Sequence, residues 1–129
     1  MADIMIIDDD AAIRRILKRV LEAAGHSIRE AGDGKTALRH FAGNPADLVI
    51  SDIYMPDMGG IEFLTRVREA FPDAKIIAMS GGGPLAKDRV LGAASVLGAV
   101  DVMEKPLTVE EVERTVERAL AGSEGSAPD

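Results

Sequence analysis

Five polar residues that lie far apart in the chain each stand at or just after the end of a short apolar segment. They are Asp8 and Asp9, Asp52, Ser80 and Lys105. If they converge, the three carboxylates repel one another, and a hard cation with oxygen ligands relieves this conflict. Few protein ligands and retained water favour Mg²⁺ over Ca²⁺. A cation and an ammonium group would also neutralise the oxygens of a phosphoryl group, and a hydroxyl would donate a hydrogen bond to one of them while a carboxylate attacks in line. The set therefore predicts phosphoryl-transfer chemistry.

The segments that must position these residues include five strand-like runs. Strands are expected at residues 4–7, 27–31, 48–53, 75–79 and 101–103. The first, third and fourth are almost continuous runs of apolar residues rather than alternations of apolar and polar ones. Continuous runs are typical of strands that are covered on both faces, as in a parallel sheet.

Between these runs, apolar residues recur at the three- and four-residue steps of a helix. Helices are expected at residues 13–24, 36–41, 61–71, 90–97 and 108–120. This (βα)5 order predicts an α/β fold, a doubly wound five-stranded parallel sheet with helices on both faces. Because the carboxyl ends of parallel strands meet at one edge, where such sheets bind ligands, the five polar residues are expected to converge there.

The composition narrows the classes of function. The 129 residues carry a formal net charge of −7, which disfavours direct binding to nucleic acid or to an anionic membrane surface. The chain contains no cysteine, and no apolar run approaches the roughly twenty residues of a membrane span. We expect a cytoplasmic protein with one domain at residues 1–120, followed at 121–129 by a flexible tail or linker stub.

Four sequence blocks resemble the signature blocks of bacterial response-regulator receiver domains. The blocks are Met5-Ile-Ile-Asp-Asp, Ile50-Ser-Asp-Ile-Tyr-Met-Pro-Asp-Met-Gly-Gly, Ile77-Ala-Met-Ser-Gly and Glu104-Lys-Pro. The resemblance extends over residues 3–120, and the blocks agree with the family in order, in spacing and in their placement at strand ends. It implies the flavodoxin-like fold of the chemotaxis receivers, with strand order 2-1-3-4-5, and a role in two-component signal transduction.

The resemblance also implies which residues bind the metal and the phosphoryl group. Asp52 matches the position of the phosphoacceptor, which is also a ligand of Mg²⁺. Asp9 matches the acidic residue that binds Mg²⁺ directly, and Asp8 matches its partner, which acts mainly through water. The backbone carbonyl of Tyr54 matches the remaining protein ligand.

Further positions match residues that respond to the phosphoryl group. Ser80 resembles the switch hydroxyl and Lys105 the phosphoryl-binding lysine, and the resemblance implies a cis peptide between Lys105 and Pro106. The family commonly carries Tyr or Phe three positions before the lysine, whereas this chain has Val102. The usual aromatic switch therefore cannot operate here, which places the coupling between Asp52 and the signalling surface in question.

The resemblance implies a phosphohistidine donor, on a sensor histidine kinase or a histidine phosphotransfer protein, and an acceptor that is not itself an enzyme. Three alternatives remain. A Mg²⁺-dependent phosphatase with an aspartate nucleophile, of the haloacid-dehalogenase type, would share the spacing of Asp8 and Asp10, but Ala12 stands where that motif has Thr or Val. A receiver-like module could bind partners without phosphorylation. A flavodoxin-like electron carrier would share the fold, although the carboxylates would repel a flavin phosphate.

Overall fold

The computed structural model describes residues 2–52, 60–81, 98 and 100–125. Within these residues, five strands form one sheet in the order β2-β1-β3-β4-β5, and all neighbours are parallel. The strands are β1 (Asp3–Ile7), β2 (Ser27–Ala31), β3 (Leu48–Asp52), β4 (Lys75–Ser80) and β5 (Asp101–Glu104). The predicted α/β fold and strand order are confirmed, and the strand ends agree with the prediction to within one residue.

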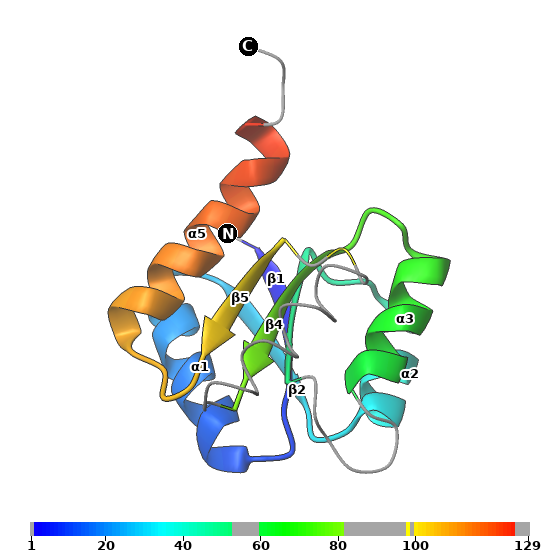
Figure 1. The fold of residues 1–129 in the computed structure, drawn as a ribbon, viewed down its shortest axis with the longest axis horizontal. Helices are drawn as coiled ribbons and strands as arrows, with labels where there is room; N and C mark the ends of the chain where they lie inside the picture. The colour runs from blue at the N-terminus through cyan, green and yellow to red at the C-terminus, as the bar shows by residue number, and fades with distance from the viewer. Residues whose placement is uncertain (1, 53–59, 82–97, 99, 126–129) are drawn as a thin grey trace.

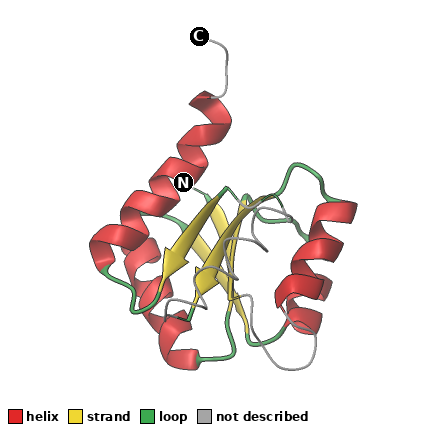
Figure 2. Ribbon diagram, in the orientation of Figure 1, coloured by secondary structure: helices red, strands yellow, loops and turns green. Residues whose placement is uncertain are grey.

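Helices cover both faces of the sheet, as Figures 1 and 2 show. They are α1 (Ala11–Ala23), α2 (Gly34–Gly43), α3 (Gly60–Ala70) and α5 (Val109–Gly125). Helices α1 and α5 lie on one face, and α2 and α3 lie on the other. The helix expected at residues 90–97 lies outside the described residues. Among the described helices, none combines the length and the apolar character that a membrane crossing needs.

The end of α5 differs from the prediction, which placed a flexible tail from residue 121 onward. The helix continues to Gly125, five residues beyond Leu120. Glycine lowers helix propensity but keeps its backbone N–H, so Gly122 does not have to end the helix. Residues 126–129, for which the tail was also predicted, lie outside the described residues.

The hydrophobic core consists of two layers, one on each face of the sheet. Side chains of β1 alternate between the layers. Ile4 and Ile6 pack with residues of α1 and α5, whereas Met5 and Ile7 pack with residues of α2 and α3. All five residues of β3 are buried. This two-sided burial is the physical reason for the continuous apolar runs in the sequence.

Side-chain caps fix the start of two helices that flank the polar edge. The Asp10 carboxylate accepts a hydrogen bond from the backbone N–H of Ala12 at 2.9 Å, at the start of α1. The Thr108 hydroxyl accepts one from the N–H of Glu111 at 3.1 Å, at the start of α5. Asp10, the third acidic residue of the run at residues 8–10, thus caps α1.

A third cap, at α2, gives a test of stability. The Asp33 carboxylate accepts hydrogen bonds from the backbone N–H of Thr36 at 2.8 Å and from its hydroxyl at 3.1 Å. These bonds lower the pKa of Asp33 below its ordinary value of 3.8. The stabilisation is therefore present above the ordinary pKa, and it is lost as the pH falls through the lower pKa of the folded state.

We expect Asp33→Ala to lower the free energy of unfolding by about 1 kcal/mol at neutral pH. The difference from wild type should shrink in acid, where the carboxylate of the wild-type protein also becomes protonated. Urea unfolding at several pH values measures this, with Glu69→Ala, at an exposed position of α3, as the control. Equal stability of Asp33→Ala and wild type at neutral pH would contradict the capping role.

Candidate functional site

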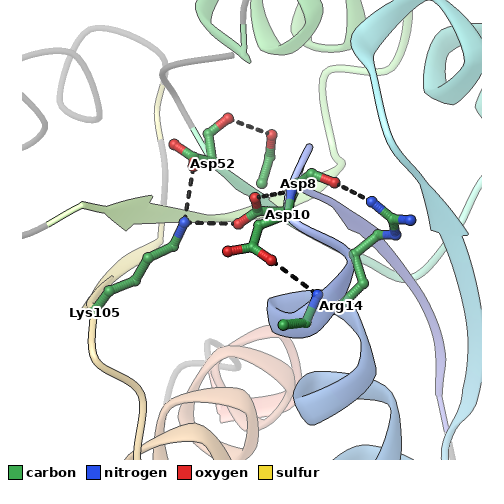
Figure 3. A network of polar contacts seen from close by, with 7 residues as sticks. Asp8, Asp10, Arg14, Asp52 and Lys105 are labelled. Atoms are coloured by element: carbon green, nitrogen blue, oxygen red, sulfur yellow. Dashed lines mark hydrogen bonds and ion pairs between the residues drawn. The ribbon is translucent and has the colours of Figure 1, made fainter.

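Three of the predicted residues meet at the carboxyl edge of the sheet. Asp8 directly follows β1, Asp52 ends β3, and Lys105 directly follows β5. The Lys105 Nζ lies 2.8 Å from Asp8 Oδ2 and 2.9 Å from Asp52 Oδ2, so one ammonium group bridges two carboxylates (Figure 3). The parallel topology brings these residues together, because they are 97 and 53 positions apart in the chain.

The site is largely removed from water. The side chain of Asp8 is fully buried, and those of Asp52 and Lys105 are 10% and 17% exposed. Burial by itself lowers the pKa of Lys105, but hydrogen bonds to Asp8 and Asp52 and their negative charges outweigh it, so the pKa is raised. Lys105 therefore stays positively charged at neutral pH.

Asp9 adds a third carboxylate at the surface of the site. Oxygen atoms of Asp8, Asp9 and Asp52 lie within 4.8 Å of one another. The pKa of Asp9 is raised by loss of hydration, by a hydrogen bond and the charge of Asp8, and to a smaller extent by the charge of Asp52. A backbone hydrogen bond acts in the opposite direction, and water screens part of the shift because Asp9 is exposed.

These residues fit a hard divalent cation. Three carboxylates surround one small volume, whereas a single ammonium group, that of Lys105, bridges two of them. Loss of hydration is the largest cause of the raised pKa of Asp9, and the negative charges of Asp8 and Asp52, which a cation would offset, add to it. Carboxylate oxygens are the ligands that Mg²⁺ prefers. The donor set therefore agrees with the metal that the sequence predicts.

The structure places the other predicted residues to different extents. Ser80 ends β4 at the same edge and is in register with Glu104 of β5. Tyr54 lies outside the described residues. The peptide between Lys105 and Pro106 is cis, as predicted. Val102 is partly buried and packs against the core layer below α2 and α3.

One residue at the site was not predicted from the sequence. Arg14 of α1 donates from Nη1 to the backbone carbonyl of Asp8 at 2.6 Å and from Nε to Glu30 at 3.2 Å. An arginine one turn after a helix cap is usually a solvated surface residue. Its position shortly after the acidic pair is the only signal in the sequence. Every residue type has a backbone carbonyl, so a contact with one cannot be predicted from the residue types.

The geometry therefore presents a nearly buried carboxylate, Asp52, beside a charged ammonium group and two further carboxylates. A family model described as the response regulator receiver domain matches residues 4–117. The chain belongs to this family. As a receiver domain it is a module of two-component signalling, as the resemblance in its sequence implies.

Individual relatives agree with this assignment. The receiver domain is 37% identical over 121 residues to the DNA-binding transcriptional regulator NtrC of Azospirillum brasilense, covering 92% of this chain and 24% of that protein. It is 36% identical to the transcriptional regulatory protein FixJ of Bradyrhizobium diazoefficiens, covering 96% and 59%. This chain thus spans about a quarter of NtrC and less than two thirds of FixJ.

Solved structures show the same fold. The chemotaxis protein CheY4 of Vibrio cholerae superposes with a TM-score of 0.83 and 30% identity, covering 93% of this chain and 99% of that one. NtrX of Brucella abortus superposes with a TM-score of 0.90 and 29% identity, covering 97% of this chain and 28% of NtrX. The predicted CheY-like architecture is confirmed.

Proposed function

We propose that this receiver domain accepts one phosphoryl group on Asp52 in a Mg²⁺-dependent reaction and thereby switches its affinity for a partner. The donor is a phosphohistidine of a sensor histidine kinase or a histidine phosphotransfer protein. The observation that carries the proposal is the Asp52 carboxylate, whose Oδ2 lies 2.9 Å from the Lys105 ammonium at the sheet edge that also holds Asp8 and Asp9.

The residues of the site divide the chemistry among them. An oxygen of Asp52 attacks phosphorus, the bond between phosphorus and the donor imidazole nitrogen breaks, and its electron pair stays on that nitrogen. Lys105 neutralises a phosphoryl oxygen and at the same time keeps Asp8 compensated. Asp8, Asp9 and Asp52 would hold Mg²⁺, which when bound supplies further neutralisation of the phosphoryl oxygens.

A labelling experiment distinguishes an acceptor from an enzyme. The protein is incubated with acetyl phosphate and Mg²⁺, its intact mass is followed, and hydrolysis of p-nitrophenyl phosphate is measured in parallel. We expect the mass to rise by one phosphoryl group and hydrolysis of the phosphomonoester to stay at background. Steady turnover of the phosphomonoester would instead support the phosphatase, and no labelling under any condition would support a module that works without phosphorylation.

Metal binding should depend on Asp9 more than on Asp8. Asp9 is exposed and available for direct ligation, whereas buried Asp8 already accepts hydrogen bonds from Lys105 and from the backbone N–H of Asp10. We expect Asp9→Ala to weaken Mg²⁺ binding by about tenfold or more and Asp8→Ala to weaken it less. Calorimetric titration at fixed ionic strength measures both affinities.

The matched control is Asp10→Asn, which removes a neighbouring negative charge but keeps a side-chain oxygen for the cap of α1. Its affinity for Mg²⁺ should stay close to that of the wild-type protein. If all three variants lost affinity equally, the effect would be one of general charge, and the assignment of Asp9 as the direct ligand would be wrong.

The relatives bear on how the switch is read. NtrC and FixJ are named as regulators of transcription, and this chain matches only part of each. With a net charge of −7, the domain itself is poorly suited to contact DNA phosphates. We therefore propose that its phosphorylation is read by a protein surface rather than by nucleic acid.

A further inference from the structure

Arg14 joins three elements next to the acidic pair. Its side chain rises from α1, its Nη1 donates to the backbone carbonyl of Asp8 at 2.6 Å, and its Nε donates to Glu30 of β2 at 3.2 Å. Figure 3 shows that the guanidinium group approaches Asp8 from the side opposite to Lys105. Arg14 therefore holds the main chain of Asp8, whereas Lys105 holds its side chain.

The remaining polar groups of Asp8 are also engaged. Its backbone N–H donates to the carbonyl of Ala31 at 3.2 Å. Its Oδ1 accepts from the N–H of Asp10 at 2.9 Å, and its Oδ2 accepts from Lys105. Arg14 thus holds the carbonyl of Asp8, while Ala31, Asp10 and Lys105 hold its N–H and its two carboxylate oxygens.

The Asp8 carbonyl belongs to the planar peptide unit that joins Asp8 to Asp9. A bond that fixes this carbonyl also fixes the N–H and the Cα position from which the Asp9 side chain departs. Asp9 is the exposed member of the carboxylate cluster, so neighbouring side chains restrain it less than they restrain buried Asp8. Its direction toward the cluster therefore depends strongly on the orientation of its own main chain.

We propose that Arg14 is a positioning residue for the cation site, because its bond to the Asp8 carbonyl orients the carboxylate of Asp9. This inference rests on the proposed binding of Mg²⁺. Glu30 pairs with the guanidinium group and offsets part of its charge, which reduces the repulsion between Arg14 and a bound cation.

Loss of the Arg14 charge and loss of its positioning role predict opposite changes in the affinity for Mg²⁺, which makes the inference testable. Loss of a positive charge beside three carboxylates strengthens cation binding when electrostatics alone acts. Loss of the anchor weakens it, and removal of a residue that orients a metal ligand typically costs about tenfold to a hundredfold in affinity. The direction of the change therefore identifies the role of Arg14.

The experiment compares Arg14→Met with Lys18→Met by calorimetric titration with Mg²⁺ at fixed pH and ionic strength. Lys18 is on the same helix and lies 3.6 Å from Glu30, so its replacement removes an equal charge from the same carboxylate. We expect Arg14→Met to bind Mg²⁺ about tenfold more weakly and Lys18→Met to bind it as wild type does or slightly more tightly. In labelling with acetyl phosphate, the half-saturating concentration of Mg²⁺ should rise for Arg14→Met, while the rate at saturating Mg²⁺ stays close to wild type.

Equal or tighter binding in Arg14→Met would overturn the inference. If Arg14→Met does not fold, Arg14→Lys provides the test. Lysine keeps the positive charge but lacks the guanidinium group that reaches both Asp8 and Glu30. Weaker Mg²⁺ binding in this variant supports the positioning role, and unchanged affinity excludes it. A wild-type protein that takes up a phosphoryl group but shows no affinity for Mg²⁺ would refute both the metal site and this inference, while leaving Asp52 as the acceptor.

Discussion

Replacing Asp52 with Asn should abolish the gain of a phosphoryl group while the domain stays folded. The amide has nearly the shape of the carboxylate but lacks the anionic oxygen that attacks phosphorus. Lys105 keeps its bond to Asp8, 2.8 Å away, so the sheet edge does not lose its remaining ion pair. Intact-mass measurement with acetyl phosphate and Mg²⁺ should show one added phosphoryl group in the wild-type protein and none in Asp52→Asn.

The matched control is Asp47→Asn, which changes an acidic residue that precedes the same strand, β3. Asp47 accepts a hydrogen bond from the N–H of Asp3 at 2.8 Å, at the amino end of the sheet and away from Lys105. This variant should be labelled like wild type. Labelling of Asp52→Asn to the wild-type level would show that another residue is the acceptor, and the proposed function would then lose its central residue.

The polar edge could be predicted from the sequence because parallel strands leave little choice about where their ends lie. Asp8 directly follows β1, Asp52 ends β3 and Lys105 directly follows β5, and each of these strands contains apolar residues that mark it in the sequence. The helical crossovers of a (βα) chain make these strands parallel, which places their carboxyl ends at one edge of the sheet. The convergence of residues 97 positions apart thus follows from patterns that are local in the sequence.

Other features depend on three-dimensional contacts that have no such local pattern. The sequence indicates that Lys105 lies near the carboxylates, but not that it bridges Asp8 and Asp52 at nearly equal distances. The contact between Arg14 and the Asp8 carbonyl depends on how α1 packs against β1 and β2. The extension of α5 to Gly125 depends on a small difference in helix propensity near the end of the chain.

The bridging position of Lys105 leads to the second large effect. In the absence of divalent cations, Lys105→Met should lower the free energy of unfolding, because it leaves fully buried Asp8 and nearly buried Asp52 without their shared cation. Breaking a fully buried ion pair costs about 3–5 kcal/mol. Since Lys105 and Asp52 keep some contact with water, we expect about 2 kcal/mol. Asp52→Asn should instead raise the free energy of unfolding or leave it unchanged, because it removes one of the mutually repelling carboxylates.

The pH dependence gives an independent check. The folded state raises the pKa of Lys105 above its ordinary value of 10.5, so the stabilisation by Lys105 is complete below that value. It is lost as the pH rises through the higher pKa of the folded state. Urea unfolding should therefore show a constant difference between wild type and Lys105→Met around neutral pH, and a smaller one in strong alkali.

Mg²⁺ and a second substitution complete the test of Lys105. Mg²⁺ should stabilise Lys105→Met more than wild type, because the metal then supplies the positive charge that the variant lacks. In the double variant Lys105→Met with Asp52→Asn, the loss of stability should be smaller than in Lys105→Met alone, since only one buried carboxylate is left without compensation. If Lys105→Met were as stable as wild type without metal, and the double variant no more stable than Lys105→Met, the ammonium group would not be what holds the two carboxylates together. The repulsion at this edge would then have to be relieved by protonation, and the site would be poorly prepared to receive a dianionic phosphoryl group.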